Sequence, residues 1–460
     1  MSGACDDDAG EPSLEPDARV DAAAPFDGGG EGRPDATLDA TANVVADAAA
    51  DTATPPSEVP DAAPVADASL AAGPDASAPG VPTGALDVLF VIDNSGSMAS
   101  EQLKVAQQLP NLVRVLTSGD RYPGVPDANL PPGAAAKRKF PAVTSLHLGV
   151  ISTNAGGIDE LPSNAQEAIR SCADLGDDGK LLNSTTVAVD GVIATNRSEF
   201  VGYDAGQVVL PPRPECDLPG LPTYQQFVAG DNADAVTTAF GCVAALGVRG
   251  CPFEQPLESM WKALAPSTGS DALHQFINGG KGQGDRYNEG FLRAEATLAV
   301  VLVSDEEDCS ISDQGKVMFS LTQEAEDEYG ELNLRCFQNA DRSELVQPVQ
   351  RYLDGLKSLK PAHPERIVFA ALVGVPQDAV ASRQSIRAIL EREDMRYAEN
   401  PQSPGFPTRS CVSDRGDEAY PPRRLLQVAD GLADRAVIAS ICEADYGEAF
   451  AALVDKLVSP

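Results

Sequence analysis

Four short, mostly apolar runs constrain the fold of this chain. They lie at residues 86–93, 146–153, 298–305 and 367–373. The first contains the unbroken apolar stretch 88–92, which is typical of a strand buried on both faces of a parallel sheet, and the other three are similar. Segments with helical periodicity lie between and around the runs, at residues 103–116, 257–264 and 345–356. This alternation predicts an open, doubly wound, mostly parallel α/β sheet with helices on both faces, as in Rossmann-like folds.

The first 82 residues have a different composition. They are mostly Ala, Asp, Pro and Gly, they hold 17 acidic residues against 2 arginines, and Phe26 is their single aromatic residue. Such a segment buries too little apolar surface to offset its chain entropy. We therefore expect residues 1–82 to form a disordered, self-repelling tether and residues 83–460 to form the folded domain.

Cys5 is a candidate anchor for this tether. Met-Ser-Gly-Ala-Cys followed by three aspartates resembles the end of a bacterial lipoprotein signal, in which the cysteine carries lipid. The apolar segment that normally precedes such a cysteine would lie upstream of Met1. The resemblance implies a membrane-tethered lipoprotein, and the alternative is a free cysteine.

The other eight cysteines suit four disulfides in an oxidising compartment, the alternative being reduced thiols in the cytoplasm. We therefore expect an extracytoplasmic protein of the cell envelope, tethered, periplasmic or secreted. Proximity in the sequence suggests the pairs Cys172 with Cys216, Cys242 with Cys251, Cys309 with Cys336, and Cys411 with Cys442.

Charge and histidine content disfavour several functions. The chain has 69 acidic and 34 basic residues, a net charge of −35, so binding to nucleic acid or to an anionic membrane surface is not expected. The three histidines, His147, His274 and His363, leave little material for a zinc site or for a nucleophile with an imidazole base. We expect the protein not to be an enzyme.

Polar residues follow two of the apolar runs. Asp93, Ser95 and Ser97 alternate after the first run, and Asp305 ends the third. Alternate residues of an extended segment face the same way, and the carboxyl ends of parallel strands meet at one edge of a sheet. Carboxylate and hydroxyl oxygens suit a hard divalent cation, Mg²⁺ or alternatively Ca²⁺ or Mn²⁺.

This pattern resembles the metal-ion-dependent adhesion site of von Willebrand factor type A domains. In that family an Asp, two Ser, a Thr from a second loop and an Asp from a third hold a divalent ion, and an acidic residue of a partner completes its shell. The resemblance implies metal ligation by Asp93, Ser95, Ser97 and Asp305. The second loop, residues 250–255, contains no Thr, so Glu254, Thr153 or water is expected in its place.

The resemblance implies an extracytoplasmic binding or adhesion-type module that uses the ion to engage a protein or other ligand presenting a carboxylate. If Glu254 replaces the hydroxyl, partner carboxylates bind less well and Ca²⁺ becomes more suitable. One alternative is a metal-free structural or scaffold domain. Another, less favoured, is an aspartate-based phosphohydrolase, in which a second carboxylate would stand where this chain has Ser95.

The folded part is larger than the family's core of about 200 residues, so long loops are expected around the sheet. Candidate insertions, stapled by the disulfides, lie near 118–143, 154–240, 306–342 and 376–440. Those that follow Thr153 and Asp305 would form the rim of the binding surface. We expect residues 306–308 to be a solvated acidic loop and residues 174–180 to be a turn.

Overall fold

The computed structural model describes residues 84–125, 140–159, 167–183, 187–189, 192–194, 216, 218, 220–248, 250–269 and 271–458. The predicted tether and Cys5 lie outside these residues, as do parts of the insertions expected near 118–143 and 154–240.

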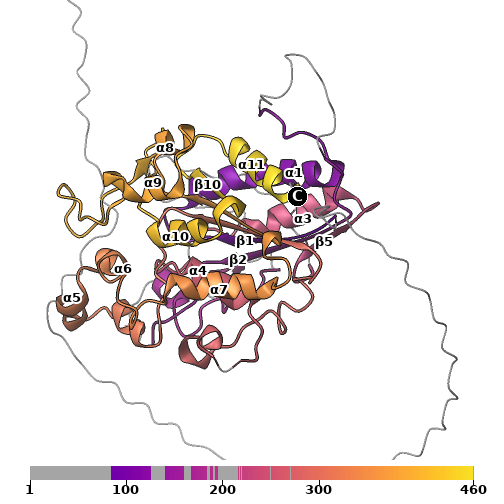
Figure 1. Cartoon of the computed structure of the whole chain (residues 1–460). Helices are drawn as coiled ribbons and strands as arrows, with labels where there is room; N and C mark the ends of the chain where they lie inside the picture. Colours follow the sequence, from indigo (N-terminus) through magenta and orange to yellow (C-terminus); the bar gives the residue numbers. More distant parts are fainter. Residues whose placement is uncertain are drawn as a thin grey trace, which may run out of the picture. The chain divides into compact units, whose positions relative to one another are not determined.

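A six-stranded sheet with the order β10-β7-β6-β1-β2-β5 forms the centre of the domain (Figure 1). Neighbouring strands are parallel except at one edge, where β5 runs antiparallel to β2. The predicted doubly wound α/β fold is confirmed, and the four apolar runs form β1, β2, β6 and β7. The strands are β1 (Ala85–Ile92), β2 (Ser145–Ser152), β5 (Gln225–Val228), β6 (Thr297–Ser304), β7 (Ile367–Val373) and β10 (Ala436–Ser440).

Helices cover both faces of the sheet and create two hydrophobic cores (Figure 1). Successive residues of a strand point to opposite faces, so Phe90 of β1 packs in one core and Leu89 in the other. The first face carries α1 (Ala99–Ser118), α3 (Ala233–Ala244) and α11 (Gly447–Val458). The second carries α4 (Pro256–Leu264), α7 (Val349–Leu359) and α10 (Arg423–Gly431).

Two strands lie inside ranges that the sequence assigned to insertions. β5 falls within 154–240 and β10 within 376–440, and both belong to the central sheet. Shorter elements occupy the connections. They are α2 (Glu167–Ser171), β3 (Val187–Val189), β4 (Val192–Ala194), α5 (Gln323–Tyr329), α6 (Arg335–Gln338), α8 (Gln377–Ala381), α9 (Ile386–Glu391), β8 (Cys411–Val412) and β9 (Glu418–Ala419).

Four disulfides join the eight cysteines, and two of the four expected pairs are correct. Cys309–Cys336 and Cys411–Cys442 form as predicted. The other two expectations are wrong, because the structure pairs Cys172 with Cys251 and Cys216 with Cys242. Cys172 follows β2 and Cys251 precedes α4, so the fold brings together cysteines that are 79 residues apart. The disulfides indicate an oxidising, extracytoplasmic environment.

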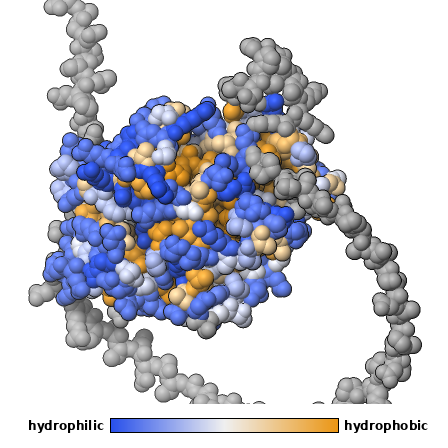
Figure 2. All heavy atoms as spheres, in the orientation of Figure 1, coloured by the Kyte–Doolittle hydropathy of each residue, from blue (hydrophilic) through white to orange (hydrophobic). Residues whose placement is uncertain are grey.

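The surface mixes polar and apolar residues. On the face drawn in Figure 2, hydrophobic residues form patches bordered by hydrophilic ones. Among the described helices, none combines the length and the apolar character required to span a bilayer. Among the described residues, six large apolar side chains are well exposed: Val228, Tyr287, Val317, Leu321, Phe406 and Val412.

Candidate metal centre at the ends of the central strands

The central strands β1 and β6 end side by side where the winding of the chain reverses. From β1 the chain passes outward to β2 and β5, and it then returns to β6 on the other side of β1. Open α/β sheets bind ligands at such reversal points, outside the carboxyl ends of the strands. Asp93 follows β1 and Asp305 follows β6, and the Asp93 backbone N–H donates to the Val303 carbonyl over 2.9 Å. The fold therefore directs both predicted aspartates to one crevice.

The loop after β1 and the end of β6 form a chain of side-chain oxygens. The buried Asp93 carboxylate accepts hydrogen bonds from the Ser95 backbone N–H (2.9 Å) and from the Ser304 hydroxyl (2.7 Å). The Ser95 and Ser97 hydroxyl oxygens lie 3.4 Å apart, and the Ser97 side chain hydrogen-bonds to Asp305. Ser97 is exposed, so the oxygens extend from the sheet to solvent. The structure thus brings together the four residues that the sequence singled out.

The loop before α4 lies against the same strand ends. The Gly250 backbone N–H donates to the Asn94 carbonyl (2.7 Å), and that of Gln255 donates to the Thr153 carbonyl (2.9 Å). A Cβ at Gly250 would lie 2.0 Å from Asn94 Oδ1, so a larger residue there would have to displace the Asn94 side chain. Glu254 and Thr153, the two side chains considered for the second loop, are both buried at this edge.

Three buried oxygens in this region have no hydrogen-bond partner within the described residues. They are Asp305 Oδ1, Thr153 Oγ1 and Asn94 Oδ1. Leaving a buried polar atom unsatisfied costs about 1–3 kcal/mol, so native structures contain few of them. Two of the three belong to residues predicted to face a cation.

Four carboxyl groups, those of Asp93, Glu254, Asp305 and Glu306, share the crevice. Burial is the main cause that raises the pKa of each of them, and it brings the pKa of Glu306 to about 7. The charges of Glu306, Asp93 and Asp305 raise the pKa of Glu254 further, and those of Asp93 and Glu306 do so for Asp305. No lysine or arginine in the described ranges forms an ion pair with any of the four. The crevice thus concentrates negative charge without a cationic side chain.

The loop after Glu306 is not the solvated acidic loop that we expected, because Glu307 and Asp308 are buried. Asp308 accepts hydrogen bonds from the Leu257 backbone N–H at the start of α4 (3.0 Å) and from the Arg424 Nε (2.9 Å). Glu307 accepts from the Arg424 backbone N–H (3.1 Å) and from the Tyr397 hydroxyl. These two acids fasten the end of β6 to helices α4 and α10.

A hairpin that the sequence did not reveal borders the crevice. It contains β8 and β9, and the Tyr420 backbone N–H that follows it donates to the Asp305 carbonyl over 2.8 Å. Asp417 in the hairpin accepts a hydrogen bond from the Ser100 hydroxyl at the start of α1 (2.6 Å). Its strands are two residues long, so no hydrophobic period marks them, and the cysteine pair Cys411–Cys442 is the one sequence signal that places it near the sheet.

The segment 174–180 forms turns, as predicted. Its carboxylates are used for structure: Asp177 accepts a hydrogen bond from Ser152, and Asp178 lies 2.6 Å from the Lys262 Nζ.

The donor set of the crevice fits a hard divalent cation. Its unpartnered carboxylate and hydroxyl oxygens, and its uncompensated negative charge, are the features that Mg²⁺ and Ca²⁺ sites require. Within the described ranges, no group of three or more His, Cys, Asp or Glu side chains is arranged around a common metal position. The set at the strand ends instead combines carboxylates with the hydroxyls of Ser95, Ser97 and Thr153.

Comparison of the chain with protein-family models, with curated proteins and with solved structures gives no match.

We predict that the metal-free protein loses stability as the pH rises from about 5 to 8. Burial raises the pKa of Glu307 to about 7, so the folded state holds a proton that the unfolded state releases near pH 4.5. Stability from this group is therefore present at low pH and is lost as the pH approaches 7, by about 3 kcal/mol. Urea unfolding in the presence of a chelator measures this effect. Glu307→Gln should flatten the profile, and a wild-type stability that stays constant or rises with pH would contradict the prediction.

Proposed function

We propose that this domain is an extracytoplasmic binding module of the von Willebrand factor type A kind, which uses a divalent cation to engage an acidic group of a partner. The uncompensated cluster of Asp93, Glu254, Asp305 and Glu306 carries this proposal. The cluster is costly unless a cation offsets it, because Asp93, Glu254 and Asp305 are buried and the charges of its members raise the pKa of Glu254 and Asp305 further.

In this proposal Asp93, Ser95, Ser97 and Asp305 hold the ion. Ser97 supports an open outer face, because it is exposed while Asp93 and Ser95 are buried. A divalent ion bound there supplies a positive charge that attracts a carboxylate from solution. The role of the protein's own residues is to hold the oxygens in place: the Gln102 side-chain amide donates to the Asp93 carbonyl (2.7 Å), and Ser304 orients the Asp93 carboxylate.

Thr153 is the better candidate for the oxygen that the second loop lacks. Its buried hydroxyl has no hydrogen-bond partner among the described residues, whereas Glu254 carries a carboxyl group whose pKa is raised well above the ordinary value. A neutral ligand at this position leaves the ion more positive toward a partner carboxylate. Ligation by Glu254 would favour Ca²⁺ over Mg²⁺, since Ca²⁺ accepts more oxygen ligands in a less regular geometry.

Calorimetric titration of the full chain with Mg²⁺, Ca²⁺ and Mn²⁺ tests the proposal. The wild type should give saturable heat with at least one ion, and Asp93→Ala should give none. Thr153→Val should weaken the ion's affinity about tenfold, as expected for the loss of one oxygen ligand, whereas Glu254→Gln should leave it unchanged or raise it. Wild-type heat that does not saturate, or that Asp93→Ala retains, would exclude this site.

A second titration tests whether the bound ion recognises an acidic group of a partner. With the ion bound, a short peptide that contains one aspartate should give a further heat, and the same peptide with asparagine should not. Asp93→Ala should abolish the difference between the two peptides. Equal heats from both peptides would exclude recognition of an acidic group while leaving the ion site intact.

A metal-free scaffold is the second candidate. The hydrogen bonds from Ser304 to Asp93 and from Ser97 to Asp305 favour it, because they satisfy part of both carboxylates without an ion. The same ion titrations separate the two candidates.

The proposed location is the outer side of a bacterial membrane. The four disulfides support an oxidising compartment, and lipidation of Cys5 would hold the domain at the end of its acidic tether. Mass spectrometry of the protein purified from membranes would detect the lipid on a peptide that begins at Cys5.

A further inference from the structure

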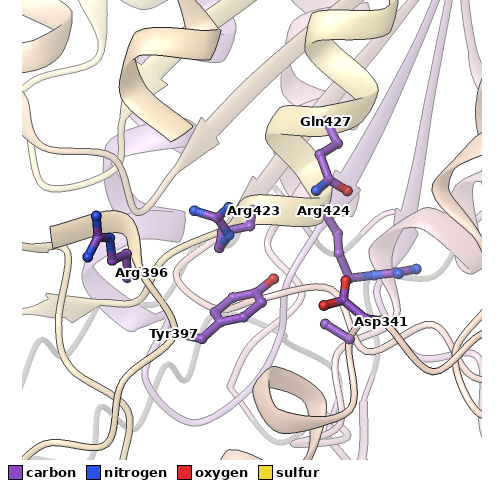
Figure 3. A pocket seen from close by; sticks show the side chains of 7 residues that line it. Asp341, Arg396, Tyr397, Arg423, Arg424 and Gln427 are labelled. Atoms are coloured by element: carbon purple, nitrogen blue, oxygen red, sulfur yellow. The ribbon is translucent and has the colours of Figure 1, made fainter. Parts of the chain in front are cut away.

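A cavity of about 250 Å³ lies between the start of α10 and two loops that are distant in the sequence (Figure 3). It is separate from the crevice at the strand ends, although Arg424 and Tyr397 in its wall also hold Asp308 and Glu307. Its lining residues are Ala340, Asp341, Arg396, Tyr397, Arg423, Arg424 and Gln427.

Three arginines meet in this cavity, in a chain that has twice as many acidic as basic residues. Arg424 is buried and is neutralised by Asp308, 2.9 Å from its Nε. Arg423 and Arg396 differ from it, because neither forms an ion pair within the described residues. The cavity therefore presents two guanidinium groups whose charge the protein leaves uncompensated.

Arg423 is held in place by neutral partners. Its Nη1 donates to the carbonyls of Leu390 and Met395, both over 2.8 Å, and its guanidinium lies 5.4 Å from the centre of the Tyr397 ring. A guanidinium has five N–H donors, so several remain for a ligand. Figure 3 shows the Arg423 side chain between Arg396 and Arg424, above the Tyr397 ring. The Arg423 guanidinium is thus held in a position from which it can donate hydrogen bonds to a planar anion.

Asp341 limits which anion fits. In Figure 3 it is drawn on the side of the view opposite Arg396, and no ion pair or hydrogen bond of its carboxylate occurs in the described structure. The uncompensated charges of the cavity are thus two positive and one negative. A compact trianion or dianion such as phosphate would be attracted to the arginines but repelled by Asp341.

We propose that this cavity binds a free acidic amino acid. Its two carboxylates would pair with Arg396 and Arg423, since a guanidinium fork matches a carboxylate in shape and charge. Its ammonium group would pair with Asp341. This inference does not depend on the proposed metal site.

Saturation-transfer NMR with the full chain and glutamate tests the proposal. Because a bound metal ion would also attract carboxylates, the measurements are made on metal-free protein. Glutamine, which lacks one carboxylate, should bind at least about tenfold more weakly than glutamate. Equal affinities for the two, no saturable signal, or tighter binding of inorganic phosphate would overturn the proposal.

Two variants identify the groups involved. Arg396→Ala should weaken glutamate binding about tenfold or more, and Arg286→Ala, which removes an exposed arginine outside the cavity lining, should not change it. Asp341→Asn should weaken the binding of glutamate but not that of glutarate, which has both carboxylates and no ammonium group. A merely structural effect of Asp341 would change both ligands equally, and that result, or unchanged binding in Arg396→Ala, would contradict the assignment.

Discussion

Asp305→Asn should make the metal-free protein more stable and should remove its stabilisation by divalent cations. Burial and the charges of Asp93 and Glu306 raise the pKa of Asp305 well above its ordinary value, so this carboxyl group costs the folded state stability at a pH at which it is ionised in the unfolded chain. Asparagine keeps the shape and can still accept the hydrogen bond from Ser97. Without the charge, we expect a gain on the order of 1–3 kcal/mol in chelator.

Added calcium should make the wild type more stable than the Asp305→Asn variant. An ion that binds only the folded state stabilises the wild type by about 2.7 kcal/mol at a concentration one hundred times its dissociation constant. The variant has lost a ligand and should gain little. Thermal unfolding of both proteins, with and without calcium, measures the crossover, and Asp434→Asn provides an exposed control. A variant that is less stable in chelator, or that still responds to calcium, would contradict the charge argument.

The part of this site that could be predicted from the sequence depends on the long buried strands. β1 and β6 each contain a continuous apolar run, and a parallel pairing necessarily places Asp93 and Asp305 at the same edge. The alternation of oxygen-bearing side chains after β1 can also be recognised in the sequence. The parallel register of β1 and β6 then places these side chains in one crevice.

The elements that could not be predicted are short or are fixed by distant contacts. β5 has four residues and is half exposed, and β10 has only four consecutive apolar residues, so neither shows the longer apolar run that identified the other strands. The cavity is assembled from residues near 340, 396 and 424, which no spacing rule connects. The burial of Glu307 and Asp308 likewise depends on α4 and α10, whose positions follow from the whole sheet.

Replacing both Cys172 and Cys251 with alanine should be the most destabilising change in the loops around the crevice. This disulfide closes a loop of 79 residues, for which chain entropy gives a contribution of about 4.5 kcal/mol. Cys251 also stands beside Gly250, which bonds to Asn94, and three residues before Glu254. Urea unfolding should therefore show the loss of stability, and ion titration should show affinity lowered about tenfold as the loop before α4 becomes mobile.

The disulfide Cys216–Cys242 provides the matched control. It closes a loop of 26 residues and ties the chain to α3, on the face of the sheet away from α4, so its removal should cost about 3.5 kcal/mol and leave ion affinity unchanged. Removing either disulfide lowers global stability by the same mechanism. If the effect of Cys172–Cys251 on ion binding is local to the crevice, only the removal of that disulfide should lower the ion affinity. Equal loss of affinity in the two double variants would mean that ion binding follows overall stability rather than the position of the loop that carries Glu254.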